Sequence, residues 1–311
     1  MKLATLDLPS QAVLAPIAGY SDVGFRKICA TLGAGLTYTE MVSAKGLCYD
    51  SENTLDLLAT TDSEKLKAVQ IFGAEPYYIE KATCHKSLEK FDLIDINMGC
   101  PMQKIVKNGE GSALLNKPEL AEEVVRSACR GPKPVSVKIR LGFGENEFVA
   151  VDFAKRMQDA GACAITVHGR TRAQMYTGDA DWEKIAQVAQ AVTIPVFANG
   201  DVKSVDDFHK ILQTTGAQGV MLARGALGHP TIFAEIAGKD ITNIQLSDLI
   251  VTHLDTMLDF HSDKYVLNNF KKHIAYYSLG KRNAKQIKLT AYACHNCDEL
   301  RDVIRTMFAE V

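Results

Sequence analysis

The sequence predicts an α/β fold, a (β/α)8 TIM barrel followed by a small C-terminal all-helical domain. Eight short apolar runs alternate with longer amphipathic segments, polar residues gather where most of these runs end, and no strand pattern follows Ile241. Alternation of this kind is typical of parallel sheets, and a barrel carries its functional residues at the carboxyl ends of its strands. We therefore expect the barrel over residues 1–240 and the helical domain over residues 241–311.

The eight expected strands are continuously apolar, as strands buried on both faces are. They are residues 12–17, 36–41, 67–73, 93–99, 134–142, 164–170, 194–200 and 219–225. Helices are expected between them at residues 75–91, 118–129, 147–161, 182–192 and 205–216. A doubly wound sheet is the alternative, but such a sheet usually has one dominant glycine-rich turn, and no GxGxxG follows the first strand here.

Composition and charge restrict the function classes. With a net charge of −2, the protein as a whole does not attract nucleic acid electrostatically, so any basic patch that does must be local. Asp7 and Pro9 interrupt the N-terminal segment, which excludes the apolar core of a signal peptide, and no apolar run approaches the roughly 18 residues of a membrane span. With its eight scattered cysteines reduced, we expect a cytoplasmic monomer without a membrane or protein partner.

Polar side chains at the predicted strand ends suit a flat ring that carries a phosphate. The loops at residues 199–204 and 223–230 each place glycine beside an expected helix start, which favours an anion. Lys138 and His168 end neighbouring strands, and Gln70 adds an amide that both donates and accepts. The alternative interpretations are ordinary turns at the two loops and a hydrogen-bonded core histidine at His168. Flavin mononucleotide (FMN) fits such a site.

Several sequence blocks occur in a fixed order along the barrel. They are APIAGYSD (15–22), Glu40-Met41, DINMGCP (95–101), GSALL (111–115), VKIRLG (137–142), HGRTR (168–172), ANGD (198–201) and ARGALGHP (223–230). With these blocks the chain resembles the tRNA-dihydrouridine synthases, most nearly the bacterial B-type branch. It departs from the family pattern at Ile17, where methionine is common, and at Ala223, where glycine is frequent.

The resemblance implies FMN-dependent reduction of the 5,6 double bond of a D-loop uridine in tRNA, with NADPH as the reductant. Together with the ring-binding side chains above, it implies cofactor binding by Ala15, Pro16, Ile17, Ala18, Gln70, Lys138, His168, Asn199, Gly200, Asp201, Ala223 and Arg224. Asn97 is expected to orient the uracil by hydrogen bonds.

Cys100 directly follows the fourth strand, and Pro101 stiffens the turn. Reduction of uracil needs a proton on carbon 5, and a thiol with an ordinary pKa of about 8.5 is mostly protonated at neutral pH. A free cysteine is more often a small buried apolar residue, the interpretation we take for Cys29, Cys84, Cys129 and Cys163. Position alone leaves both roles open for Cys100, and the NMGCP resemblance favours the proton donor.

A single CxxC, Cys294 to Cys297, has no second cysteine pair to complete four zinc ligands, so we expect no metal.

The helical tail contains a basic segment. From Lys264 to Lys288 there are seven basic residues and no acidic one, with Tyr265, His273, Tyr276 and Tyr277 interleaved. Such a patch suits a phosphate backbone and stacking on bases, and a solvated helical face with its tyrosines in the core is an equal alternative. The residues expected to bind tRNA are Lys271, Lys272, Arg170, Arg172 and, near the rim, Lys104.

Three other functions stay open at this point. An FMN barrel acting on a free pyrimidine, like a dihydroorotate dehydrogenase, would account for the rim but not for the basic tail. A flavin-free aldolase or isomerase that binds phosphate would lack the yellow colour of a flavoprotein. A non-catalytic RNA-binding protein would form no dihydrouridine.

Overall fold

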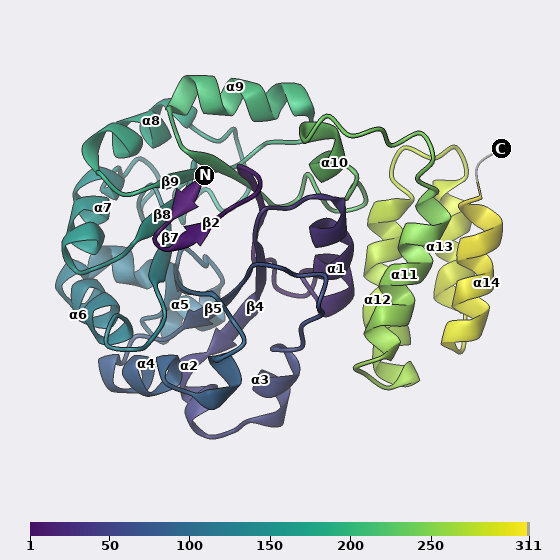
Figure 1. Cartoon of the computed structure of the whole chain (residues 1–311), viewed down its shortest axis with the longest axis horizontal. Helices are drawn as coiled ribbons and strands as arrows, with labels where there is room; N and C mark the ends of the chain where they lie inside the picture. Colours follow the sequence, from purple (N-terminus) through teal and green to yellow (C-terminus); the bar gives the residue numbers. More distant parts are fainter. Residues whose placement is uncertain (310–311) are drawn as a thin grey trace.

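In the computed structural model, which describes residues 1–309, eight parallel strands close into a barrel beside a group of helices (Figure 1). The strand order is β10-β3-β4-β5-β6-β7-β8-β9, so each strand pairs with its successor and the last pairs with the first. The predicted barrel is confirmed. Because all strands run in parallel, their carboxyl ends meet at one rim.

The barrel strands overlap the eight predicted apolar runs. They are β3 (Ala12–Leu14), β4 (Thr37–Ser43), β5 (Lys67–Phe72), β6 (Leu93–Met98), β7 (Val135–Arg140), β8 (Ala164–His168), β9 (Val196–Asn199) and β10 (Gly219–Leu222). Most end one to three residues earlier than predicted, and the last residues of the predicted runs, such as Gly73, Gly99 and Gly200, lie in the rim loops.

Helices follow the barrel strands along the chain and surround the barrel. They are α1 (Val23–Leu32), α2 (Ala44–Cys48), α3 (Glu52–Asp56), α4 (Pro76–Thr83), α5 (Gln103–Lys107), α6 (Pro118–Ala128), α7 (Ala150–Asp159), α8 (Trp182–Ala191), α9 (Val205–Thr215) and α10 (Ile232–Ile236), with short 3-10 helices η1 (Lys86–Leu88) and η2 (Gly111–Asn116). The single helix predicted over residues 75–91 was wrong. It divides into α4 and η1, because His85 adopts an extended conformation and its side chain caps Ser87.

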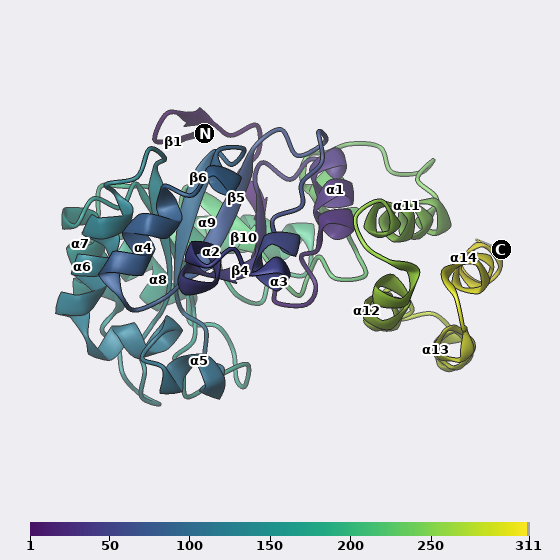
Figure 2. The same cartoon turned by 90° about the horizontal axis from the view of Figure 1, so that it is seen from below.

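A short antiparallel hairpin, β1 (Lys2–Leu3) and β2 (Leu6–Asp7), was not predicted. It lies at the end of the barrel opposite α5 (Figure 2). Its apolar side chains Leu3 and Leu8 are buried against interior residues such as Phe197 and Met221. The hairpin therefore closes the floor of the barrel and leaves the opposite rim for a site.

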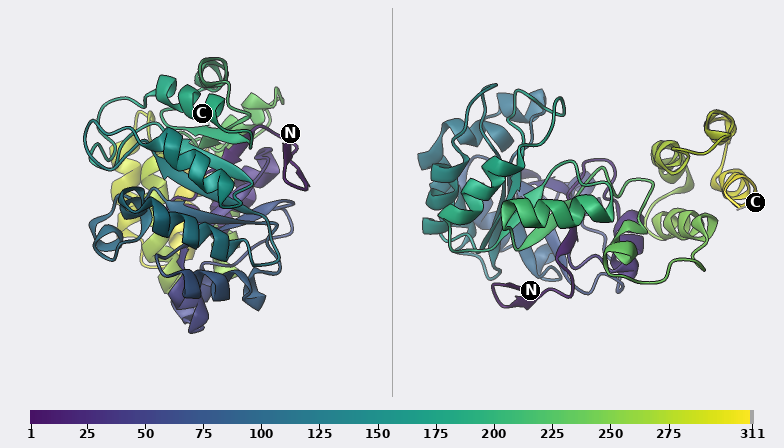
Figure 3. Two further views of the ribbon diagram at one scale, coloured as in Figure 1. Left: turned by 90° about the vertical axis from the view of Figure 1, so that its left-hand side faces the viewer. Right: turned by 90° about the horizontal axis from the view of Figure 1, so that it is seen from above.

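The C-terminal region contains four helices, which stand to one side of the barrel (Figure 3). They are α11 (Leu246–Leu258), α12 (Asp263–Tyr277), α13 (Ala284–Ala293) and α14 (Cys297–Met307). The cysteines of the CxxC are buried, and their thiols donate to the carbonyls of Thr290 and Asp263. No helix within residues 1–309 is long and apolar enough to cross a membrane.

A buried polar contact joins these helices to the barrel through α11, which packs on α1. Asp22 caps α1 by accepting from the Phe25 amide at 3.0 Å, and His253 Nε2 lies 3.0 Å from the same oxygen. His273 Nε2 lies 2.9 Å from the other carboxylate oxygen. Burial raises and the two histidines lower the pKa of Asp22, with a net shift well below its usual value. Burial lowers the pKa of His273 to about 4.

Candidate active site

A cavity of about 590 Å³ opens at the carboxyl ends of the strands, a size that suits a ring-bearing ligand. All twelve residues predicted to bind the cofactor line this cavity, and so do Cys100 and Asn97. The other predicted substrate contacts do not line it, namely Lys104, Arg170, Arg172, Lys271 and Lys272. The structure therefore gathers the predicted ring and phosphate residues at one place and leaves most of the predicted tRNA contacts outside.

Strand register explains why distant residues meet here. Asn97 pairs with Lys138 across β6 and β7, and His168 pairs with Asn199 across β8 and β9. Lys138 Nζ reaches past β8 and donates to Asn199 Oδ1 at 3.0 Å, and Asn199 in turn donates to the carbonyl of Met221 at 2.6 Å. The amine is thus fixed in the floor of the cavity by hydrogen bonds.

The cavity is electropositive. Burial lowers the pKa of Lys138 to about 8 and that of Arg140 to about 10. Burial, reinforced by the neighbouring cations, lowers the pKa of His168 well below its usual value, so the imidazole is neutral at pH 7. Among the described residues that line the cavity, Asp201 is the one acidic group. An anionic ligand would balance these charges.

The loop after β9 is held by Asp201, which adopts a left-handed conformation with φ of 58°. Its carboxylate accepts from Arg170 Nη2 at 2.6 Å and from the Ala180 amide at 2.7 Å, and it lies 3.6 Å from Arg224. A side chain at Gly200 would meet Ala180 Cβ at 2.7 Å, so only glycine fits this turn. Asp201 therefore directs Arg224 toward the cavity instead of meeting an anion itself.

A helix starts after each of the two expected phosphate loops. α9 begins at Val205, directly after the loop at 199–204. After residues 223–230, Thr231 is the N-cap residue of α10, which begins at Ile232 and has only five residues. On this second side, the charge of Arg224 is the stronger candidate for holding a phosphate.

The Cys100 loop is fixed from both sides of its backbone. Asn97 Oδ1 accepts from the amides of Gly99 at 3.2 Å and Cys100 at 2.9 Å. The Cys100 carbonyl accepts from the Ser112 hydroxyl at 2.8 Å. Burial raises the pKa of the Cys100 thiol, which keeps it protonated at neutral pH.

The other cysteines differ partly from expectation. Cys29 is buried as predicted and Cys163 is half-buried, but Cys84 and Cys129 are exposed. Both exposed residues are C-cap residues, Cys84 of α4 and Cys129 of α6.

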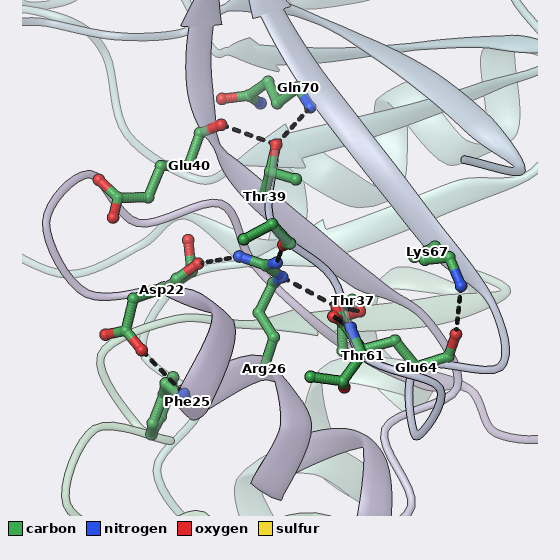
Figure 4. A network of polar contacts seen from close by, with 12 residues as sticks. Asp22, Phe25, Arg26, Thr37, Thr39, Glu40, Thr61, Glu64, Lys67 and Gln70 are labelled. Carbon is green, nitrogen blue, oxygen red and sulfur yellow. Dashed lines mark hydrogen bonds and ion pairs between the residues drawn. The ribbon is translucent and has the colours of Figure 1, made fainter. Parts of the chain in front are cut away.

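The loop at residues 15–22 is held by a buried network (Figure 4). Arg26 forms an ion pair with Glu64 at 2.9 Å and donates to the carbonyl of Ser21 at 2.7 Å. The amide of Gly19 donates to the Glu40 carboxylate, and the hydroxyl of Ser21 accepts from the amide of Ile17 at 2.9 Å. These contacts set the backbone of the loop, and Ala15, Pro16, Ile17 and Ala18 face the cavity.

Sequence reasoning missed several cavity residues, among them Arg140, Tyr176, Tyr20 and Tyr276. Arg140 donates to the carbonyls of Gly99 at 2.9 Å and Thr171 at 2.8 Å, and so ties two rim loops together. It stands two residues after Lys138 on one strand, so period-two alternation was a usable signal. No comparable signal identifies Tyr276, which meets Tyr20 edge-on at 5.3 Å from α12.

The predicted tRNA contacts are distributed differently than expected. Arg170 is buried and bonded to Asp201 and to the carbonyl of Gly178, so it cannot extend an exposed basic surface. Lys271 donates to the carbonyls of Tyr292 and Cys294, and Lys272 lies over the Tyr20 ring at 5.3 Å. Arg172 lies over the ring of Phe143, and Lys104 is exposed on α5.

Of the four rings interleaved with the basic residues, His273 and Tyr277 are core residues and are not available for stacking. Tyr265 is exposed, and Tyr276 lines the cavity.

This chain is similar to known proteins over nearly its full length. The family model described as Dihydrouridine synthase (Dus) matches residues 13–310. tRNA-dihydrouridine synthase B of Pseudomonas aeruginosa is 33% identical over 319 residues, covering 100% of this chain and 96% of that protein. Probable tRNA-dihydrouridine synthase of Rickettsia conorii is 34% identical over 298 residues, covering 93% and 90% of the two chains.

Solved structures agree on the fold. Histamine dehydrogenase from Rhizobium sp. 4-9 superposes with a TM-score of 0.62 at 12% identity, covering 82% of this chain and 50% of that enzyme. A morphinone reductase variant in complex with tetrahydroNAD gives a TM-score of 0.55 at 12% identity, covering 76% and 89%. These likenesses support the barrel, and the family match with its full-length relatives establishes that the chain belongs to the dihydrouridine synthase family.

Proposed function

We propose that this chain is an FMN-dependent tRNA-dihydrouridine synthase, which reduces the 5,6 double bond of a uridine in tRNA. The observation that carries the proposal is the electropositive rim cavity, in which half-buried Lys138 and buried Arg140 stand beside the protonated thiol of Cys100. Its full-length relatives carry the same activity in their names. A D-loop uridine as the target and NADPH as the reductant belong to the same proposal.

The residues present fit FMN. Gln70, Lys138 and His168 would hold the ring, and Arg224 with the glycine turn at Gly200 would hold the phosphate. When bound and reduced, the flavin supplies the hydride for carbon 6 of uracil. The amine of Lys138, whose pKa is about 8, provides positive charge for an anionic ring at neutral pH.

Cys100 is the proton donor in this proposal. The thiol gives its proton to carbon 5 as carbon 6 gains the hydride, and the resulting thiolate takes a proton back from water. Arg140 favours the thiolate once it has formed, because its positive charge lowers the pKa of Cys100 against the effect of burial. Asn97, in the wall of the cavity, would orient the uracil by hydrogen bonds.

The tRNA would lie across the rim and the helical region. Tyr276 and Lys272 place α12 next to the cavity, and α13 adds the exposed side chains of Lys285, Leu289 and Tyr292. Basic groups beside exposed rings suit a phosphate backbone with accessible bases.

Mapping dihydrouridine in tRNA from cells that lack and then regain this protein tests the proposal. We expect loss of the modification at defined uridines and its return with the wild-type chain. The purified protein should be yellow and should release FMN on denaturation. Reduction of a free pyrimidine with no change in tRNA would instead favour an enzyme of the dihydroorotate dehydrogenase type, and a colourless protein would contradict any flavin-dependent function.

A further inference from the structure

A buried carboxylate, Asp95, lies directly beneath the cavity without lining it. It accepts from Gln70 Nε2 at 2.7 Å and from Ser136 Oγ at 2.6 Å. Both partners stand beside it in register, Gln70 on β5 and Ser136 on β7. Asp95 is therefore bonded to the frame of the site and lies outside the volume that a ligand would fill.

A continuous series of hydrogen bonds leads from Asp95 to the Cys100 loop. Gln70 Oε1 accepts from Asn97 Nδ2 at 2.8 Å. Asn97 Oδ1 then accepts from the backbone amide of Cys100 at 2.9 Å. Gln70 and Asn97 are themselves buried, so water has little access to either amide.

The hydrogen bonds in this series all run in one direction. An ionised carboxylate only accepts, and a backbone amide only donates, so each side-chain amide between them must turn its NH2 group toward Asp95 and its oxygen toward Cys100. In that orientation Gln70 keeps its second N–H beside the cavity, and the second N–H of Asn97 makes a weak contact with the Met41 sulfur at 3.7 Å. The cavity wall then offers donors, which complement the carbonyl oxygens and acceptor nitrogens of a bound ring.

We propose that Asp95 is a positioning residue, whose carboxylate fixes the amide orientations of Gln70 and Asn97 and through them the backbone of Cys100. This inference rests on the proposed function, because it assigns Asp95 to the same reaction. Asp95 touches no reacting atom and acts only through its neighbours.

Stability alone does not account for a carboxylate here. The barrel interior below it is apolar, with Leu93 two residues earlier on the same strand. Burial raises the pKa of Asp95 to about 6, so the folded chain binds a proton more readily than the unfolded chain. Ionised Asp95 therefore lowers the free energy of unfolding at neutral pH, which a neutral residue of the same shape would avoid.

The other titratable groups that face Asp95 have pKa values that differ from that of Asp95. They are Tyr38 on β4, Lys138 on β7 and Cys163 just before β8. Burial raises the pKa of Tyr38 well above its usual value and that of Cys163 to about 12, and it lowers that of Lys138 only to about 8. At the rim, the pKa of His168 lies well below its usual value. A transition near pH 6 in this network therefore belongs to Asp95.

The test uses full-length enzyme with bound FMN, reduced by dithionite, in single turnover on tRNA between pH 5.5 and 8.5. For the wild type we expect the rate to fall on the acid side with a midpoint near pH 6, as protonated Asp95 stops being a pure acceptor. Asp95→Asn has the same shape, but its amide can face Gln70 with either end. A displacement of about 1 Å at a reacting group can lower a rate by about 10²-fold. For Asp95→Asn we therefore expect a plateau rate that is lower by up to that factor and does not fall further on the acid side.

Ser136→Ala is the matched control, since it removes the other hydrogen bond to the same carboxylate and leaves the chain to Cys100 intact. It should keep both the acid limb and most of the plateau. The melting temperature of Asp95→Asn at pH 7 should not fall below that of the wild type. A wild-type plateau in Asp95→Asn, or an acid limb that persists in it, would overturn the proposal.

A second measurement needs no variant and no turnover. The side-chain amide resonances of Gln70 and Asn97 in the wild-type protein should shift together with a midpoint near pH 6, and resonances that do not move would also overturn the inference. If the wild type forms no dihydrouridine on any tRNA while these amides titrate, the proposed function fails and the orienting role of Asp95 stands.

Discussion

The rim of the barrel and the basic face of α12 and α13 differ in how their polar groups are held. At the rim, Lys138, Asn97 and Arg140 are hydrogen-bonded to other protein groups, and Asn97 and Arg140 are buried. On the helical face, Lys264, Arg282 and Lys285 are exposed. The rim is thus an organised site, in which one substitution has a large and specific effect. On the helical face, each exposed charge contributes only a small part of the affinity for a polyanion, and salt screens that contribution.

The largest effect expected at the rim is that of Cys100→Ala. A positioned acid contributes about 10² to 10⁴-fold, so the rate of dihydrouridine formation in single turnover should fall in that range. FMN content and reduction of the flavin by NADPH should stay as in the wild type, because neither uses the thiol. Cys29→Ala is the control, a buried cysteine away from the cavity. A fully active Cys100→Ala enzyme would sink the assignment of the acid.

Lys138→Ala should give the next largest effect. A hydrogen bond to a charged group contributes about 1.5–3 kcal/mol, which corresponds to roughly 10- to 100-fold weaker retention of FMN by equilibrium dialysis. Lys210→Ala, on the exposed face of α9, should retain FMN normally. Equal retention in both variants would remove Lys138 from the cofactor site.

The lowered pKa of the Lys138 amine also predicts a pH dependence. Lys138 has a pKa of about 8 when folded, so in the enzyme without cofactor its positive charge is lost as pH rises through 8, and FMN affinity should fall over the same range. The unfolded chain holds this proton up to a pKa of about 10.4, so this group makes the free energy of unfolding rise with pH between those values. Titration of FMN affinity in wild type and Lys138→Met checks the first point, and a pH-independent affinity in the wild type would contradict it.

On the helical face, Lys285→Glu combined with Lys288→Glu should weaken tRNA binding modestly. Each lost phosphate contact should also flatten the slope of log affinity against log salt concentration by about one. NADPH oxidation should be unaffected, since neither lysine lines the cavity. Lys210→Glu is the control on the barrel side, and an unchanged slope in the double variant would place the tRNA elsewhere.

A smaller effect separates structural from binding lysines within the same segment. Lys271 donates to two carbonyls at the end of α13, so Lys271→Ala should lower the free energy of unfolding by about 0.5–1.5 kcal/mol in urea denaturation. Lys285→Ala, which is exposed, should change it much less. Equal stability of the two variants would return Lys271 to the set of candidate tRNA contacts.

The two regions also differ in how much of them the sequence could predict. Parallel strands bring their carboxyl ends together, so a polar residue such as Gln70, Lys138 or His168 at a strand end could be assigned to one cavity without knowledge of its neighbours. The hydrogen bonds among them, including the chain through Asp95, depend on register and could not be predicted.

In the helical region a sequence pattern identifies helices but not their orientation on the barrel. Tyr276 and Tyr277 are adjacent in sequence, yet Tyr276 lines the cavity and Tyr277 is buried beside His253. Which of the two meets the rim depends on how α12 packs against the loop that carries Tyr20. That packing comes from tertiary contacts, which local periodicity does not contain.

The contact between Asp22, His253 and His273 has a consequence for how this family can change over time. One carboxylate ends the loop that lines the cavity, caps α1 and meets both histidines of the helical region. Replacing the helical region with an unrelated domain would leave that carboxylate without its two histidine partners, at a cost of several kcal/mol. Residues 22, 253 and 273 should therefore be inherited as a set, and a lineage that loses the histidines should lose the aspartate as well.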